Sequence, residues 1–208
     1  IVNKYEIMMY KTIMKKIYFI IILFYSSILF SNEISEIEIE GFSIGDQLIN
    51  YLSQEYILEE IELNKNAYDY LSDDFGEVYI FENLKKYDTV SFFVKTDDEK
   101  YTIYAINAKY GYDDDLINCF TNQKKLAKKY SNAYPNSKKR EYNIEFPIDP
   151  SGESISYNIE FLFNNGDFLE VNCAKYKKEL KTQFNWQDML QVNISKSEIY
   201  DWLTNHID

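Results

Sequence analysis

Hydrophobic residues recur with two different periods along this chain, and the change from one period to the other outlines the fold. Apolar side chains within 48–52 have helical spacing, and Ser43 with Asp46 three residues later is a pattern that caps a helix N-terminus. We therefore expect a first helix that begins at Ser43 and continues through 54–62, with a kink or a restart at Ser53.

After this helix, apolar and polar residues alternate with period two in seven short segments. This is the pattern of strands that bury one face. The segments form two groups, and the polar residues between neighbours in a group are typical of turns. The predicted strands are 78–82, 89–95 and 100–110 in the first group, and 141–147, 154–163, 168–175 and 190–194 in the second.

Two further helices are predicted from their end signals. The acids of 113–115 suit the free N–H groups at a helix N-terminus, and Pro135 ends the pattern that follows. Ser195 and Glu198 have the spacing of a capping box in front of the apolar residues of 199–203. We expect one helix between the two groups of strands and another after the last strand.

The resulting order is helix, three strands, helix, four strands and helix, which predicts an α+β fold. Parallel neighbours would need a helical crossover between them, and the pattern shows no helix inside either group of strands. We therefore expect antiparallel meander sheets packed by helices, in a single domain that covers 32–208. The repeated order suggests two similar halves, although no residues repeat.

Residues 1–31 are interpreted separately, as an upstream extension followed by a signal peptide. Lys15 and Lys16 precede an apolar core at 17–25, and small residues lead to a cleavage site near Ser31. The core is too short to span a bilayer comfortably, and no second apolar segment of spanning length follows it. We expect an exported protein, periplasmic or secreted, whose mature chain does not insert stably into a membrane.

The chain is acidic and rich in aromatic residues. Its formal net charge is −12, and residues 1–31 hold four of its basic residues but one of its acids, so the remainder is more acidic still. Such a surface repels phosphate backbones and anionic headgroups, and we expect no nucleic-acid partner. The 20 tyrosines and 14 phenylalanines fit the residue usage of an AT-rich genome, or alternatively a tyrosine-rich sheet face that grips a partner.

Cys119 and Cys173 are the two cysteines of the chain. Each lies on the apolar side of its predicted element, so a helix packed on the sheet could bring them together. In an oxidising compartment such a pair is expected to form a disulfide, which would stabilise the fold by about 4 kcal/mol in the loop-entropy model. The alternative is two buried thiols.

Two short motifs near the first helix bear on hydrolysis. Residues 41–45 match the G-x-S-x-G pattern of a nucleophile elbow, but that motif needs a parallel sheet, and Ser43 is more simply a helix cap. The segment 44–48 resembles the Gly-Asp-Ser-Leu block of a lipase and esterase family, with Gln47 at the position of the nucleophilic serine. The resemblance implies hydrolysis, yet an amide cannot attack an ester, and the spacing in 201–206 departs from the family's Asp-x-x-His.

Ligands for a metal ion or a cofactor are scarce in this sequence. His206 is the sole histidine, so zinc, copper and haem sites lack ligands. The acidic clusters lack the alternating spacing and the central glycine of a calcium loop, and solvated turns or a helix cap explain them better. These clusters are 73–74, 97–99 and 113–115. We expect no cofactor, no metal ion and no catalytic residues.

Three pieces of the chain carry a resemblance to other proteins: the block IEGFSIGD at 39–46, the Asn-Cys pairs at 118–119 and 172–173, and the closing segment 195–203. On these pieces the chain resembles a group of small exported proteins from AT-rich marine bacteria, which implies export and no assigned activity. We predict a non-catalytic exported protein that binds another envelope protein, an envelope component or a small ligand. The alternative is a hydrolase of the Gly-Asp-Ser-Leu type with a degenerate nucleophile position.

Overall fold

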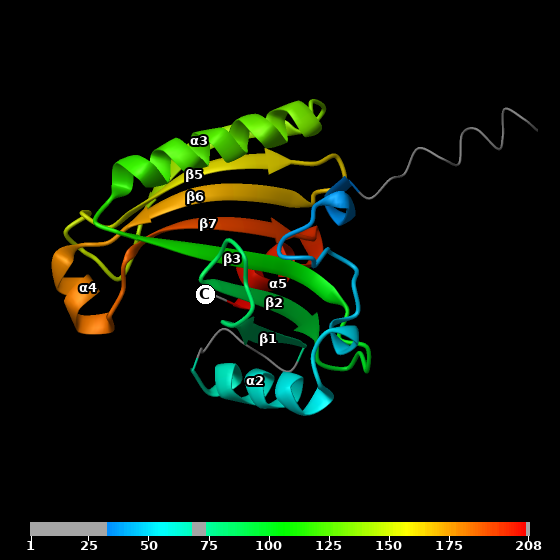
Figure 1. The fold of residues 1–208 in the computed structure, drawn as a ribbon. Helices are drawn as coiled ribbons and strands as arrows, with labels where there is room; N and C mark the ends of the chain where they lie inside the picture. Colours follow the sequence, from blue (N-terminus) through cyan, green and yellow to red (C-terminus); the bar gives the residue numbers. More distant parts are fainter. Residues whose placement is uncertain (1–32, 68–73, 207–208) are drawn as a thin grey trace, which may run out of the picture. The chain divides into compact units, whose positions relative to one another are not determined.

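Seven strands form a single antiparallel sheet, and helices lie on both of its faces and along one edge (Figure 1). The computed structural model describes residues 33–67 and 74–206, and the part that begins at Glu33 is one compact unit. The strands are β1 (Phe75–Ile80), β2 (Thr89–Lys95), β3 (Ile103–Asp113), β4 (Lys138–Glu145), β5 (Ile155–Leu162), β6 (Phe168–Lys175) and β7 (Asp188–Ser195). The helices are α2 (Gln54–Ala67), α3 (Leu116–Ala133), α4 (Lys178–Phe184) and α5 (Ser197–His206), and the short 3-10 turns are η2 (Glu33–Glu36) and η3 (Leu48–Asn50).

The predicted α+β class, the antiparallel pairing and the order of the strands are confirmed. The two groups of strands share one sheet, in the order β1-β2-β3-β7-β6-β5-β4, because β3 pairs with β7 along most of its length. α3 carries the chain from β3 at the centre to β4 at the far edge, and the second meander then runs back to the first (Figure 1). β2 and β6 have the predicted bounds, and the other strands begin or end within three residues of them.

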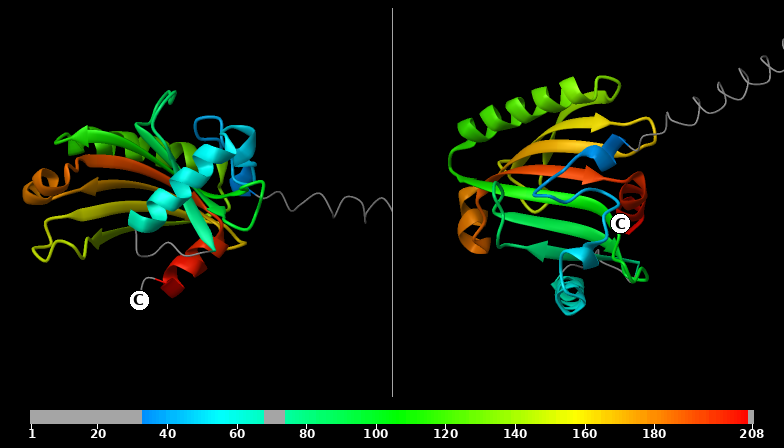
Figure 2. Two further views of the ribbon diagram at one scale, coloured as in Figure 1. Left: turned by 90° about the horizontal axis from the view of Figure 1, so that it is seen from below. Right: turned by 45° about the vertical axis from the view of Figure 1, so that its right-hand side comes forward.

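The front face of the sheet, which we define as the face covered by α3, holds the main hydrophobic core. Alternate residues of the strands point to this face and are apolar, as the sequence predicts, except in β4, whose apolar residues Tyr142 and Ile144 point to the back face. α3 and the segment 33–52 cover them, while α5 lies on the opposite, back face (Figure 2). Buried residues of the front face include Val90, Phe92, Ile106, Phe161, Leu169, Val171, Val192 and Ile194.

A disulfide between Cys119 and Cys173 fastens α3 to β6 on this face. The two Cα atoms are 6.1 Å apart, and both side chains are fully buried. The bond closes a sequence separation of 54 residues, as predicted. It therefore ties the crossover helix to a strand of the second meander.

α2 protects the exposed edge of the sheet at β1. Its Tyr56 hydroxyl donates to the carbonyl of Tyr79 (2.8 Å), and its Asn64 amide donates to the carbonyl of Glu77 (2.9 Å). The Glu60 carboxylate accepts from the N–H of Tyr79 (3.1 Å). These bonds satisfy edge groups that would otherwise be open to pairing with another chain.

The predicted helix start at Ser43 is wrong, whereas the restart expected at Ser53 is confirmed, because α2 begins at Gln54. The Ser43 hydroxyl donates to the carbonyl of Ile37 (3.2 Å) and caps nothing, while its N–H donates to the Asp46 carboxylate (2.9 Å). Gly45 has a φ of +94°, which no right-handed helix allows, so the apparent capping box closes a loop. The cap belongs to Ser53, whose hydroxyl accepts from the N–H of Tyr56 (3.2 Å).

The chain near the C-terminus differs from prediction in two further ways. α4 lies between β6 and β7 and was not predicted, because none of its side chains is buried and it therefore has no apolar stripe. α5 begins at Ser197, two residues after the predicted capping serine. Its first N–H donates to the carboxylate of Asp167 (2.9 Å), which comes from the loop between β5 and β6.

Candidate functional site

A row of polar residues crosses the middle of the back face, with one residue from each of the seven strands. The cross-strand partners follow one another without a break from β1 to β4. We call this the central row, and it consists of Tyr79, Ser91, Asn107, Asn193, Glu170, Glu160 and Arg140. A second polar row runs beside it and consists of Thr89, Lys109, Gln191, Asn172, Asn158 and Tyr142.

These rows differ from the solvated face that many antiparallel sheets present to water. Such a face carries exposed polar side chains, whereas Ser91, Asn172 and Glu160 are 0%, 3% and 7% exposed. Asparagine is also disfavoured in strands, yet it occupies the two rows at four positions. Short amide and hydroxyl groups held out of water on a sheet are suited to bind a polar partner rather than to solubilise the surface.

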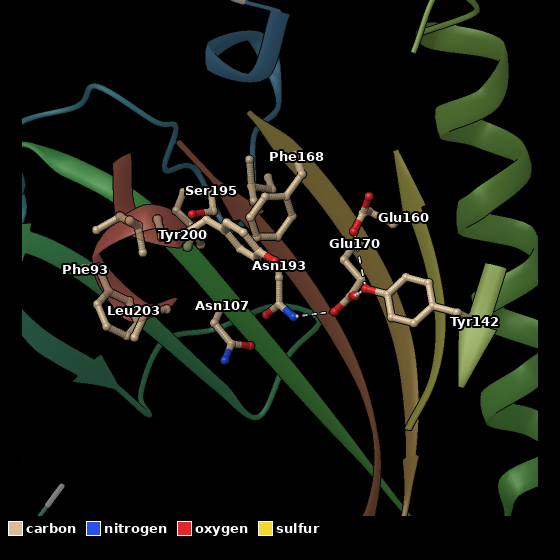
Figure 3. Close-up of a pocket in the computed structure, with 14 residues that line it drawn as sticks. Phe93, Asn107, Tyr142, Glu160, Phe168, Glu170, Asn193, Ser195, Tyr200 and Leu203 are labelled. Carbon is tan, nitrogen blue, oxygen red and sulfur yellow. Dashed lines mark hydrogen bonds between the residues drawn. The ribbon is translucent and has the colours of Figure 1, made fainter. Parts of the chain in front are cut away.

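Where the central row meets α5, the back face is hollowed into a pocket of about 430 Å³ (Figure 3). The floor carries polar groups of the two rows. The wall on the side of α5 is apolar. The floor residues are Asn107, Asn193, Glu170, Glu160 and Tyr142, and the main wall residues are Phe93, Phe168, Ile199, Tyr200 and Leu203.

α5 is held over the sheet by contacts of its first turn and of its middle. Besides the hydrogen bond that its first N–H donates to Asp167, Glu198 pairs with Lys95 of β2 (2.6 Å). Further along, the ring of Trp202 packs against Phe75 of β1, with 5.1 Å between ring centroids. The wall of the pocket is therefore fixed by residues from both meanders.

Two glutamates on the floor are direct cross-strand partners. Like charges in this position repel each other, and only Glu160 has a cation beside it, because Arg140 donates to it from Nε (2.8 Å) and Nη2 (2.5 Å). Glu170 forms no ion pair with any residue that the structure describes. Its neighbours are neutral donors: the Tyr142 hydroxyl (2.7 Å) and the amides of Asn172 (3.0 Å) and Asn193 (3.2 Å).

Tyr142 links the two carboxylates. Its hydroxyl donates to Glu170 and also lies 3.3 Å from Glu160 Oε2. Burial, together with the hydrogen bond to Glu170 and its charge, raises the pKa of Tyr142 well above the ordinary tyrosine value. The phenol therefore remains protonated and acts as a donor at neutral pH.

Three buried acceptors of the two rows have no hydrogen-bond partner among the described residues: Ser91 Oγ, Asn107 Oδ1 and Asn172 Oδ1. The orientation of two amides follows from the chemistry of Glu170. Because a carboxylate only accepts, Asn172 and Asn193 must turn their nitrogens toward it and their oxygens away. Of these three residues, Asn107 lines the pocket. Buried polar groups normally have a hydrogen-bond partner.

The structure does not unite the residues of the two hydrolase motifs. Ser43 and Asp46 lie in the loop before η3, and neither lines the pocket. The Ser43 hydroxyl binds a carbonyl, and the Asp46 carboxylate accepts from the Tyr51 hydroxyl (3.1 Å) as well as from the N–H of Ser43. The side chain of His206 lies outside the described residues. Within the described ranges, no group of three or more metal-ligating side chains occurs.

None of the pocket residues was predicted from the sequence as a site residue. One signal was present, because Asn107, Asn158, Asn172 and Asn193 each stand between apolar residues inside a predicted strand. Periodicity places such residues on the outer face of their own strand. Periodicity does not show that these residues are cross-strand neighbours, because cross-strand pairing depends on the register between strands.

Comparisons with protein-family models, with curated proteins and with solved structures found no match to this chain. The resemblance to small exported proteins therefore stays a prediction. In the portion that the structure covers, no helix is both long and apolar enough to cross a membrane.

Proposed function

We propose that this protein is an exported, non-catalytic binding protein whose ligand occupies the pocket between the back face and α5. The observation that carries the proposal is Asn107, a residue that lines the pocket and whose buried Oδ1 has no described partner. A buried polar group without a partner costs about 1 to 3 kcal/mol. A bound ligand that donates hydrogen bonds would remove this cost.

Export is supported by the leader-like pattern of residues 1–31 and by the disulfide. Disulfides persist in oxidising compartments and are rare in the cytosol, and the bond between Cys119 and Cys173 joins two separate elements of the fold. An envelope component or a small molecule of that compartment is the ligand class that we favour. The hydrolase alternative lacks support, because Gln47 pairs with Thr102 in an isolated bridge and does not line the pocket.

The proposal is tested on protein recovered from cells, which should lack residues 1–31 by intact mass. A mixture of small organic fragments is screened by ligand-observed NMR, and binders are mapped on the amide and tyrosine signals of the back face. We expect the signals of Asn193 and Tyr142 to shift. Asn193→Trp fills the pocket and should abolish the shifts.

The matched control is Asn143→Trp, which places the same ring on an exposed position of β4 that does not line this pocket. It should leave fragment binding unchanged. A screen in which no fragment moves these signals, or in which Asn193→Trp binds as well as the parent protein, would contradict the proposed pocket.

A further inference from the structure

We propose that the ligand of this pocket is an organic primary ammonium ion with an apolar body. This inference rests on the proposed function, and it names the chemical class of the ligand. The charge, the hydrogen-bonding groups and the wall of the pocket each support it separately.

The charge of the pocket is negative and incompletely offset. Its lining contains Glu160 and Glu170 and no lysine, arginine or histidine. Arg140 offsets Glu160, so Glu170 is left with hydrogen bonds from neutral groups only. Glu170 is half-buried, and a partly buried carboxylate without a cationic partner favours a cation beside it. Phosphates, sulfates and carboxylates would meet repulsion here and are disfavoured as ligands.

The hydrogen-bonding groups favour a cation that can donate. Asn107, Asn193 and Glu170 occupy three consecutive positions of the central row, and neighbours in such a row lie about 5 Å apart. A primary ammonium group has three donors. One group placed above Asn193 could therefore donate to Glu170, with Asn107 on the other side of Asn193 (Figure 3).

The wall of the pocket favours an apolar body attached to the ammonium group. Phe168 and Tyr200 meet edge to face, with ring centroids 6.0 Å apart, and Ile199 and Leu203 continue the wall along α5. A pocket of about 430 Å³ leaves room beyond the ammonium group for a ring or a short alkyl chain. A second charge at that end would face apolar side chains, which disfavours linear polyamines.

The test is calorimetric titration of the purified protein with four probes that share one phenyl body. The probes are 2-phenylethylamine, 2-phenylethanol, 3-phenylpropionate and trimethyl(2-phenylethyl)ammonium, at neutral pH and low salt. We expect the primary amine to bind at least about tenfold more tightly than the alcohol, as a hydrogen bond to a charged group implies. The quaternary ion should be weaker than the amine because it has no donor, and the anion should not bind measurably.

Two matched variants sharpen the test. Glu170→Gln keeps the shape of the floor and removes its unpaired charge, so the amine should lose at least about tenfold in affinity while the alcohol is unaffected. Glu99→Gln makes the same exchange at an exposed position outside the pocket and should change neither. If Glu170→Gln fails to fold, Asn107→Asp serves instead, because a further carboxylate on the pocket floor should tighten amine binding several-fold.

The outcomes separate the ligand class from the pocket. Equal affinity for the alcohol or the anion, or no response to either floor variant, would overturn the ammonium assignment and leave the pocket intact. A quaternary ion that binds as tightly as the amine would overturn the role of hydrogen-bond donation to the floor. Failure of all four probes would also overturn the ammonium class, and the separate fragment screen would then decide whether the pocket binds ligands.

Discussion

The two faces of one sheet are built from the same strands and yet follow opposite rules. On the front face, the buried polar side chain of Gln123 in α3 has hydrogen-bond partners. It is 3% exposed, and its amide nitrogen donates to the carbonyls of Tyr157 (2.6 Å) and Val171 (2.9 Å). On the back face, buried acceptors such as Asn172 Oδ1 lack a partner. The front face stabilises the fold. We infer that the back face keeps polar groups without partners, which lowers the stability of the free protein and is offset when a ligand binds.

The largest effect should come from the front face, through its disulfide. Replacing Cys119 and Cys173 together with alanine should lower the free energy of unfolding by about 4 kcal/mol, because the unfolded chain regains the entropy of a long loop. Urea unfolding measures this loss. The reduced parent protein is the control and should unfold at nearly the same urea concentration, and a loss below about 1 kcal/mol would show that packing alone holds α3 in place.

Asp149 contrasts with the unpartnered groups of the back face. It is a buried polar residue of the loop between β4 and β5, and both of its carboxylate oxygens accept hydrogen bonds. It is 6% exposed, and its carboxylate accepts from the N–H and hydroxyl groups of Ser151 (3.1 and 2.6 Å) and Ser154 (2.8 and 2.6 Å). These hydrogen bonds hold the pKa of Asp149 well below the ordinary value of 3.8. We expect Asp149→Asn to destabilise the fold at neutral pH by less than the loss of the disulfide does.

The pH dependence of this variant follows from the sign of the shift. A carboxyl group with a lower pKa in the folded chain adds stability above its unfolded pKa and loses it as the pH falls toward the folded value. The parent protein should therefore lose stability as the pH falls below about 4, and Asp149→Asn should lose less over the same interval. Thermal unfolding at a series of pH values measures both slopes, and parallel slopes would show that Asp149 is not held in its charged form by folding.

The smallest effect should come from the back face. Ser91 is fully buried, and its hydroxyl has no partner among the described residues. Ser91→Ala should therefore leave stability unchanged or raise it by up to about 1 kcal/mol, since a buried hydroxyl without a partner is unfavourable. Urea unfolding with a common m-value measures the change.

The reverse exchange on the front face is the matched control. Val192 is also fully buried, and Val192→Thr introduces a hydroxyl of similar size into the apolar core. This variant should lose about 2 kcal/mol. If Ser91→Ala instead destabilises the protein by a similar amount, the buried hydroxyl of Ser91 is not unfavourable. That outcome would contradict the proposed contrast between the two faces.

Local patterns were sufficient for much of the fold. Alternation located all seven strands. The acids of 113–115 predicted the N-terminus of α3, and the carboxylate of Asp115 caps it by accepting from the N–H of Asn118 (3.1 Å). The helix start predicted at Ser43 was wrong, because a serine followed by an acid three residues later occurs in loops as well as in helix caps. α4 was not predicted, because a short helix without buried side chains has no apolar periodicity in its sequence.

The class of the fold, the antiparallel strands and the pair of cysteines were predictable, because they depend on periods and spacings within short stretches. The pairing of β3 with β7, the position of α5 on the back face and the row of seven polar residues were known only from the folded chain. Each of these depends on the register between strands far apart in the chain. Alternation tells which residues share a face of one strand, but the register decides which of them meet.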